Sequence, residues 1–232
     1  MTKRNIALLA GAALCWPMMA QAGQLVVVEA RGVALAQGAT LDSDKPINLK
    51  AGQHLTLIAA DGTTLQLDGP FDKAPSSSTA KGAGLSAKLA ALGAGGQRFS
   101  EVGTTRRTAI VKLPSPWLLD ISHSGAVCMR DSDANPVMWR PASIKPANIT
   151  IMPDDRSWRA TLRWPANRAQ MAATSDVPLH SGNTYYVSAG GERHAISIYP
   201  VPESLSNARM QAAWLAQKGC EAQAEALLRT VK

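Results

Sequence analysis

The chain has 232 residues, with 24 Lys and Arg against 17 Asp and Glu, and a formal net charge of +7 at pH 7. This length allows two small domains, each with its own core. The basic residues are scattered and no nucleic-acid recognition motif is present, so we expect no nucleic-acid partner. Acidic polymers, anionic surfaces and acidic proteins remain open as partners of such a basic surface.

Residues 1–22 have the pattern of a secretory signal peptide. Lys3 and Arg4 form a positive start, an apolar run follows, and a small-residue cleavage site ends at Ala22. We therefore expect export to the periplasm or the medium. Removing Lys3 and Arg4 leaves 22 basic and 17 acidic residues, a net charge of +5. No later segment is apolar for long enough to cross roughly 30 Å of hydrocarbon, so we expect no transmembrane segment after cleavage.

Residues 23–72 show short strands separated by turn signals. Leu25 to Val28 is a fully buried type of strand, and later leucines alternate with polar residues at the period of a half-buried strand, around 47–49, 55–57 and 65–67. Asp61-Gly62 is the sharpest hairpin signal, because Gly supplies a positive φ without steric cost.

This segment resembles the small all-β module of FecR-like proteins. The residues that carry the resemblance are Gly38 to Leu41, Ile47-x-Leu49, Ala51-Gly52, Leu55-Thr56-Leu57, Asp61-Gly62, Leu65-x-Leu67 and Gly69-Pro70-Phe71. The resemblance implies an all-β fold and an interaction role outside the cytoplasmic membrane. FecR-type signalling to a sigma factor also needs a membrane span and a cytoplasmic segment, which we do not find, so we do not expect that circuit here.

Residues 73–108 are rich in Gly, Ser and Ala, which is typical of a linker. Leu85, Leu89 and Leu92 have helical spacing, so this linker contains a possible short helix over 85–92.

Residues 109–202 form a second β-rich region with regularly spaced turn residues, which favours a sandwich-like domain. Leu162-x-Trp164-Pro165 followed by Gly182-x-x-Tyr185-x-Val187 resembles the Trp and Tyr strands of fibronectin-type or immunoglobulin-like domains. The expected strands are Trp117 to Ser122, Ala126 to Met129, Val137 to Arg140, Ile149 to Met152, Trp158 to Trp164, Tyr185 to Ser188 and Ala195 to Tyr199.

Residues 203–232 change to a helical period, with Ser204 as the expected N-cap of a first helix and Gly219 as its end. A second helix over 221–230 completes a C-terminal helical hairpin. The fold class we predict is therefore mainly β, with a small β module, a β-sandwich-like domain and this hairpin.

Two cysteines remain after signal cleavage, and an even pair in an exported protein indicates one disulfide between Cys128 and Cys220. The bond would close a loop of about 90 residues and fasten the hairpin to the second domain. A redox-active pair is disfavoured, because the two cysteines are far apart and form no Cys-x-x-Cys motif.

No catalytic or metal-binding motif emerges. The segment 122–130 superficially resembles the Ser-His-Gly-Cys segment of exported L,D-transpeptidases, but His123 and Cys128 are five positions apart and a disulfide-bonded Cys128 cannot act as a nucleophile. No serine-hydrolase elbow, phosphate-binding loop or paired metal-ligand spacing is present. We therefore expect no enzyme activity, no cofactor and no metal.

In the stretch Trp158 to Trp164, alternation places the two tryptophans on one side of the strand and Arg159, Thr161 and Arg163 on the other. We expect the tryptophans to be buried, and the Arg side is the candidate contact face.

The sequence therefore predicts a non-catalytic envelope protein that acts as a protein-interaction or assembly module, with edge-strand pairing as a physical route. The alternative is a peptidoglycan or carbohydrate binding protein, which would need aromatic side chains on an exposed face.

Overall fold

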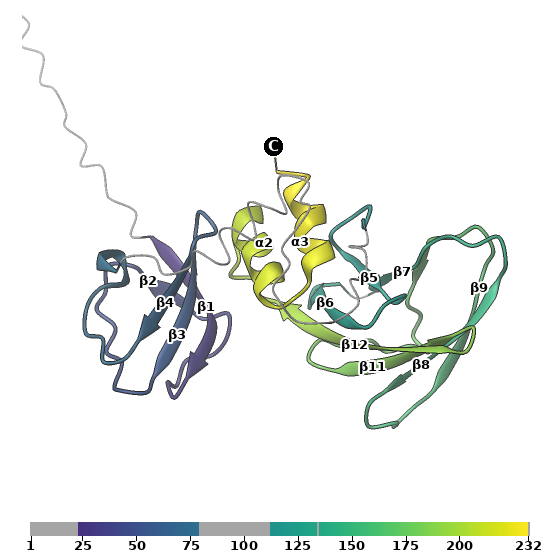
Figure 1. Ribbon diagram of the computed structural model, residues 1–232, viewed down its shortest axis with the longest axis horizontal. Helices are drawn as coiled ribbons and strands as arrows, with labels where there is room; N and C mark the ends of the chain where they lie inside the picture. Colours follow the sequence, from purple (N-terminus) through teal and green to yellow (C-terminus); the bar gives the residue numbers. More distant parts are fainter. Residues whose placement is uncertain (1–22, 79–111, 134, 232) are drawn as a thin grey trace, which may run out of the picture.

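The computed structural model describes residues 23–78, 112–133 and 135–231. Over these residues the chain forms three β-sheets and two α-helices (Figure 1). This confirms the mainly β fold with a C-terminal helical hairpin. The expected signal peptide and the possible helix at 85–92 lie outside the described residues. Within the described ranges, no helix is both long enough and apolar enough to span a membrane.

The N-terminal sheet has four antiparallel strands in the order β2-β1-β3-β4. The Asp61-Gly62 hairpin is confirmed, with Gly62 at a φ of +85°. The strand predicted around 47–49 is present only as an isolated antiparallel bridge between Leu49 and Phe71, next to a backbone bond from the Ile47 N–H to the Lys73 carbonyl at 3.1 Å. The strands are β1 (Gln24–Arg31), β2 (Thr40–Asp42), β3 (His54–Ala59) and β4 (Thr64–Asp68), and a short 3-10 helix, η1 (Pro75–Ser77), follows.

Both faces of this sheet contribute to a hydrophobic core. Leu25 and Val27 point into a core of leucines belonging to the N-terminal unit itself. Val26 and Val28, which alternate with them along β1, point to the other side and pack with residues of the C-terminal hairpin. The uninterrupted apolar run at the start of β1 therefore reflects two separate cores.

The C-terminal region contains a three-stranded sheet, β10-β7-β5, and a five-stranded sheet, β6-β12-β11-β8-β9. Their inward side chains meet in one core that includes Trp164 and Tyr185. All seven predicted strands are present, and the sequence interpretation missed β10. The strands are β5 (Leu118–Asp120), β6 (Gly125–Arg130), β7 (Val137–Trp139), β8 (Ala147–Pro153), β9 (Ala160–Trp164), β10 (Gln170–Ala172), β11 (Thr184–Ala189) and β12 (Glu192–Val201).

The hairpin consists of α2 (Ala208–Gln217) and α3 (Glu221–Leu228), separated by Gly219 at a φ of +82°. The predicted cap at Ser204 is wrong. The N-cap is Asn207, whose Oδ1 accepts the backbone N–H of the second and third residues beyond it, each at 3.0 Å. The hydroxyl of Ser204 instead donates to the Gly38 carbonyl at 2.7 Å, and so ties the segment before α2 to the N-terminal unit.

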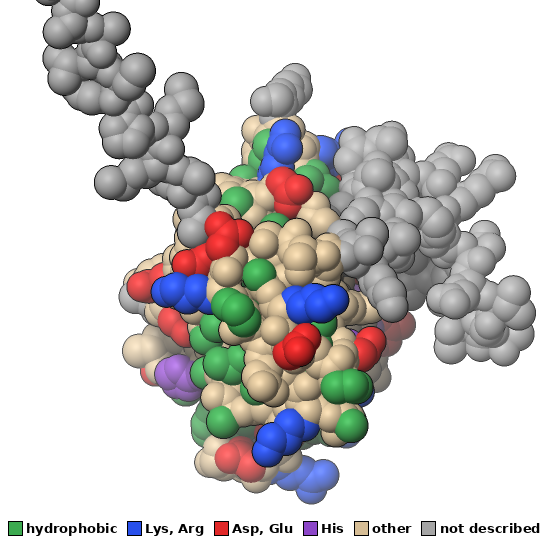
Figure 2. Space-filling model, turned by 90° about the vertical axis from the view of Figure 1, so that its left-hand side faces the viewer, with side chains coloured by type: hydrophobic (Ala, Val, Ile, Leu, Met, Phe, Trp, Pro, Cys, Tyr) green, Lys and Arg blue, Asp and Glu red, His purple; other side chains and the backbone are tan. Residues whose placement is uncertain are grey.

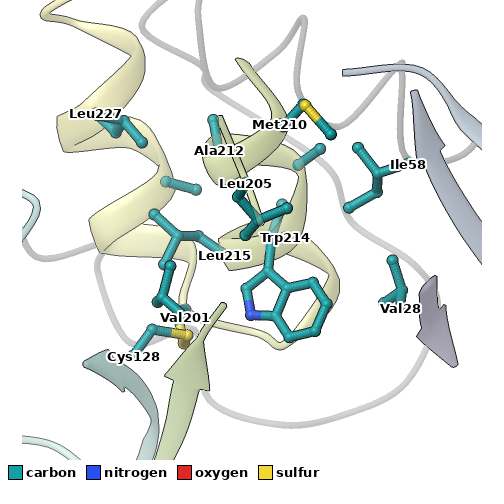
Figure 3. Packing of buried hydrophobic residues seen from close by; sticks show 14 of the residues in the cluster. Val28, Ile58, Cys128, Val201, Leu205, Met210, Ala212, Trp214, Leu215 and Leu227 are labelled. Carbon is teal, nitrogen blue, oxygen red and sulfur yellow. A yellow bond between two sulfur atoms is a disulfide. The ribbon is translucent and has the colours of Figure 1, made fainter. Parts of the chain in front are cut away.

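The predicted disulfide is confirmed: Cys128 on β6 is bonded to Cys220, the residue before α3. Figure 3 shows the core above this bond, where Trp214 of α2 lies between Val201 of β12 and Val28 of β1. The indole N–H of Trp214 donates to the Pro200 carbonyl at 3.0 Å. The hairpin therefore packs on the five-stranded sheet and on the N-terminal sheet at once.

Lys218, at the end of α2, makes a polar contact across the same boundary. Its Nζ donates to Gln37 Oε1 at 2.9 Å and lies 4.8 Å from the centre of the Trp214 ring. Burial lowers the pKa of the Lys218 ammonium, and the nearby Glu29 carboxylate partly opposes that shift. Nζ also lies 3.4 Å from the Val28 carbonyl, so this half-buried lysine donates to two groups of the N-terminal unit.

Candidate interaction site

Two of the predicted contact residues, Thr161 and Arg163, lie on β9, an edge strand of the five-stranded sheet, and Arg159 directly precedes this strand. Figure 1 shows β9 at the outer end of the molecule, away from the N-terminal sheet. Arg159, Thr161 and Arg163 are exposed, whereas Trp164 is fully buried. We call Arg159, Thr161 and Arg163 the β9 surface. Trp158 was expected to be buried in the strand, but β9 begins only at residue 160 and Trp158 is half-buried, with its ring centroid 5.9 Å from that of Tyr185.

Backbone hydrogen bonding in the neighbouring strands determines which groups of β9 face outward. Just past the end of β8, the N–H of Asp154 donates to the Thr184 carbonyl at 3.0 Å. Along an antiparallel strand, successive residues point their N–H and C=O groups to opposite sides. The bond at Asp154 therefore determines which residues of β8 face β11 and which face β9. It directs the backbone groups of Ile149 and Ile151 away from β11 and toward β9.

On β9, the partners of those two residues are Leu162 and Ala160. Their N–H and C=O groups are consequently used in the ladder with β8. The backbone groups of Thr161 and Arg163 point to the open side, where no described segment pairs with them. The close contact between the hydroxyls of Thr150 and Thr161, 3.1 Å, agrees with this register, since side chains are closer at pairs without mutual backbone bonds.

The charge of the β9 surface is uncompensated within the described part of the chain. No carboxylate forms an ion pair with Arg159 or Arg163 there. Arg193, on the same face of the sheet, adds a third exposed guanidinium. At the other end of the molecule, by contrast, acidic and basic side chains are interspersed (Figure 2).

The opposite edge of the same sheet, β6, is closed by a side chain. The carboxamide of Gln223 on α3 accepts the N–H of Cys128 at 2.6 Å and donates to the carbonyl of Cys128 at 2.7 Å. It thus replaces the backbone of a neighbouring strand. Its second donor bond, to the Pro116 carbonyl at 2.9 Å, completes its pairing, and Gln223 is 2% exposed. The sheet therefore has one covered edge and one open edge.

The remaining described sheet edges are less suited to a partner. The edge strands β2, β5 and β10 have three residues each. The edge strand β4 exposes Gln66 and Asp68, and the Asp68 carboxylate is already paired with His54 at 2.7 Å. Among the described edges, β9 alone combines a strand of five residues with exposed charges that have no partner.

The tryptophans provide no exposed stacking platform in the described chain. Trp164 and Trp214 are fully buried, Trp139 is 8% exposed, and Trp117 and Trp158 are half-buried. Arg130 also covers the ring of Trp117, with 4.3 Å between its guanidinium carbon and the ring centre.

The polar group nearest to a catalytic arrangement is Asp120, Ser122 and His123. Ser122 Oγ donates to Asp120 Oδ1 at 2.6 Å and lies 2.9 Å from His123 Nδ1. The same Nδ1 lies 3.3 Å from Asp120 Oδ2. In a catalytic triad the two ring nitrogens contact the serine and the acid separately, whereas here one nitrogen contacts both. The arrangement is therefore a local turn network, and the disulfide removes Cys128 as a nucleophile.

A cleft of about 590 Å³ lies between the β6–β7 connection and residues 173–181. Its acidic groups are engaged: Asp131 accepts from Ser181 Oγ at 2.6 Å, and Asp133 is 3.0 Å from the Arg130 guanidinium. In the ranges that the structure describes, no three His, Cys, Asp or Glu residues are placed to hold a metal ion.

Comparison with known proteins adds no assignment: no family model, curated protein or solved structure matches this chain.

Proposed function

We propose that this protein is an exported, non-catalytic envelope protein that binds another envelope protein through the β9 surface. The observation that carries the proposal is the unpaired edge of β9, where two exposed arginines have no carboxylate partner in the described chain. An open edge offers backbone hydrogen bonds to a partner, and unpaired charges favour one of opposite sign.

Location and family belong to the same proposal. The signal-peptide pattern of residues 1–22 supports periplasmic or secreted location, and the disulfide between Cys128 and Cys220 is compatible with an oxidising compartment. The FecR-like pattern of the N-terminal unit supports an interaction role in the envelope. The packing of this unit on the hairpin makes it a support for the C-terminal region rather than a separate tethered module.

We rank a protein partner ahead of peptidoglycan or another glycan. Sugar-binding faces commonly use exposed aromatic rings, and the described tryptophans are buried or half-buried. Backbone groups and guanidinium groups of the β9 surface suit a polypeptide with carboxylate side chains better.

The test is a crosslinking pull-down from intact envelopes with the tagged mature protein, in which bound protein and bound glycan are both quantified. The variant Arg159→Glu with Arg163→Glu should reduce recovery of the protein partner about tenfold, which corresponds to a loss of about 1.4 kcal/mol. The control, Lys50→Glu with Lys73→Glu, makes the same charge change on exposed residues of the N-terminal unit and should leave recovery unchanged. Recovery of cell-wall material alone, or equal recovery by both variants, would contradict the proposal.

A further inference from the structure

We infer that the β9 surface binds its partner by strand addition, and that the partner is an extended acidic segment. Two carboxylates of this segment are four positions apart, and apolar residues stand on either side of the position midway between them. The inference rests on the proposed function and specifies the chemistry of the partner. Its physical basis is that the residues with outward backbone groups, Thr161 and Arg163, also carry exposed side chains.

The open backbone groups define the geometry of the added strand. Thr161 and Arg163 each offer one N–H and one C=O, so an antiparallel segment would form a hydrogen-bonded pair with each of them. The segment residues opposite Thr161 and Arg163 then project their side chains to the same exposed face. Continuing the alternation by two residues places another segment residue opposite Arg159.

This register determines the side chains of the segment. Carboxylates opposite Arg159 and Arg163 are four positions apart, with the residue opposite Thr161 midway between them. The intervening residues lie beside Ala160 and Leu162, which are half-buried on the apolar side of β9. The expected pattern is therefore acidic, apolar, hydroxyl, apolar, acidic.

The charges argue against a second copy of this chain as the occupant. In antiparallel pairing of two β9 strands centred on Thr161, Arg159 of each copy would lie opposite Arg163 of the other. Like charges directly opposite each other destabilise a ladder, so the arginines oppose self-pairing and favour an acidic segment.

The two arginines should contribute unequally. Arg163 lies within β9 and its backbone groups point to the open side, whereas Arg159 precedes the first residue of β9. The ladder with β8 therefore fixes the position of Arg163 more firmly than that of Arg159. We therefore expect Arg163→Glu to reduce binding more than Arg159→Glu.

The experiment measures binding of labelled peptides to the full mature protein by fluorescence anisotropy. The probe is acetyl-Thr-Glu-Val-Thr-Val-Glu-Val-amide, and its control has the same composition with the two glutamates adjacent. We expect about tenfold tighter binding of the first peptide, the equivalent of about 1.4 kcal/mol. Equal affinities would overturn the inferred spacing.

Backbone methylation separates strand addition from simple ionic attraction. An N-methyl group on the central Thr of the probe removes the N–H that would donate to the Thr161 carbonyl, and should weaken binding about tenfold or more. An N-methyl group on the Val after the first Glu blocks an N–H that points away from β9, and should change affinity little. If the two methylated peptides bind equally, strand addition is wrong.

A charge swap and a measurement of mass complete the test. A probe with Lys in place of both Glu residues should bind the Arg159→Glu, Arg163→Glu protein better than the unmodified protein. Self-association through β9 in analytical ultracentrifugation, abolished by Thr161→Pro, would overturn the choice of partner. If the envelope pull-down depends on the arginines but the methylation test fails, strand addition is refuted and the proposed function stands. If the unmodified protein recovers no protein partner in the pull-down, the proposed function itself is refuted.

Discussion

Replacement of Gln223 by Met should strongly destabilise the protein, because Met keeps the length of the side chain and removes its polar atoms. Three hydrogen bonds disappear, one from the Cys128 N–H and one each to the carbonyls of Cys128 and Pro116. All three backbone groups then lose their partner in a site where Gln223 is 2% exposed. At about 1.5 kcal/mol for each group the cost is about 4–5 kcal/mol. The greater apolar burial of Met offsets about 1 kcal/mol of it.

The expected result is thus a loss of about 3–4 kcal/mol in the free energy of unfolding, or a fall in Tm of roughly 6–16 °C for a chain of this size. The assay is equilibrium denaturation in urea with the disulfide intact. The matched control is Gln217→Met, which makes the same change at a half-buried position of α2 and should cost under about 0.5 kcal/mol. If the two variants lose equal stability, the argument that the Gln223 amide closes β6 is refuted.

Three further predictions concern stability. Cys128→Ala with Cys220→Ala should lower the free energy of unfolding by at most about 4–5 kcal/mol, from the chain entropy of a loop with a sequence separation of 92, and unchanged denaturation would contradict it. Asn207→Ala should cost about 1–2 kcal/mol in thermal unfolding, since it removes the N-cap of α2, and an unaltered melting curve would oppose this assignment. The N–H of Thr63 donates to the Asp61 carboxylate and lowers its pKa below the ordinary 3.8. The ionised carboxylate therefore stabilises the fold above pH 3.8, and this stabilisation is lost as the pH falls through the lowered pKa. The stability advantage over Asp61→Asn should shrink below about pH 4, and a difference that is constant from neutral to acid pH would count against it.

Local signals in the sequence predicted the elements that depend on a few neighbouring residues. The Asp61-Gly62 turn needs only the conformational freedom of Gly, and it is present. The alternation around Thr161 depends only on the period of a strand, and it places the arginines outside and Trp164 inside. The pairing of Cys128 with Cys220 followed from the expectation that only these two cysteines remain in the exported chain.

Features that depend on distant contacts were missed. Ser204 was a reasonable local N-cap, but its hydroxyl bonds to Gly38, 166 positions away, and the helix starts after Asn207 instead. Strand β10 was missed because Gln170–Ala172 contains no β-branched residue and is stabilised by pairing with β7. The role of Gln223 left no local signal beyond a polar residue among alanines, because its partners lie 95 and 107 positions earlier in the chain.

Partner binding at the β9 edge can be tested by photo-crosslinking in intact envelopes with a reactive residue in place of Thr161. The matched control carries the same reactive residue in place of Gln66, which is exposed on β4, an edge strand of the N-terminal sheet. We expect a covalent adduct with a protein partner at Thr161, absent or much weaker at Gln66. An adduct at Gln66 with none at Thr161 would contradict the assignment of β9 as the binding edge.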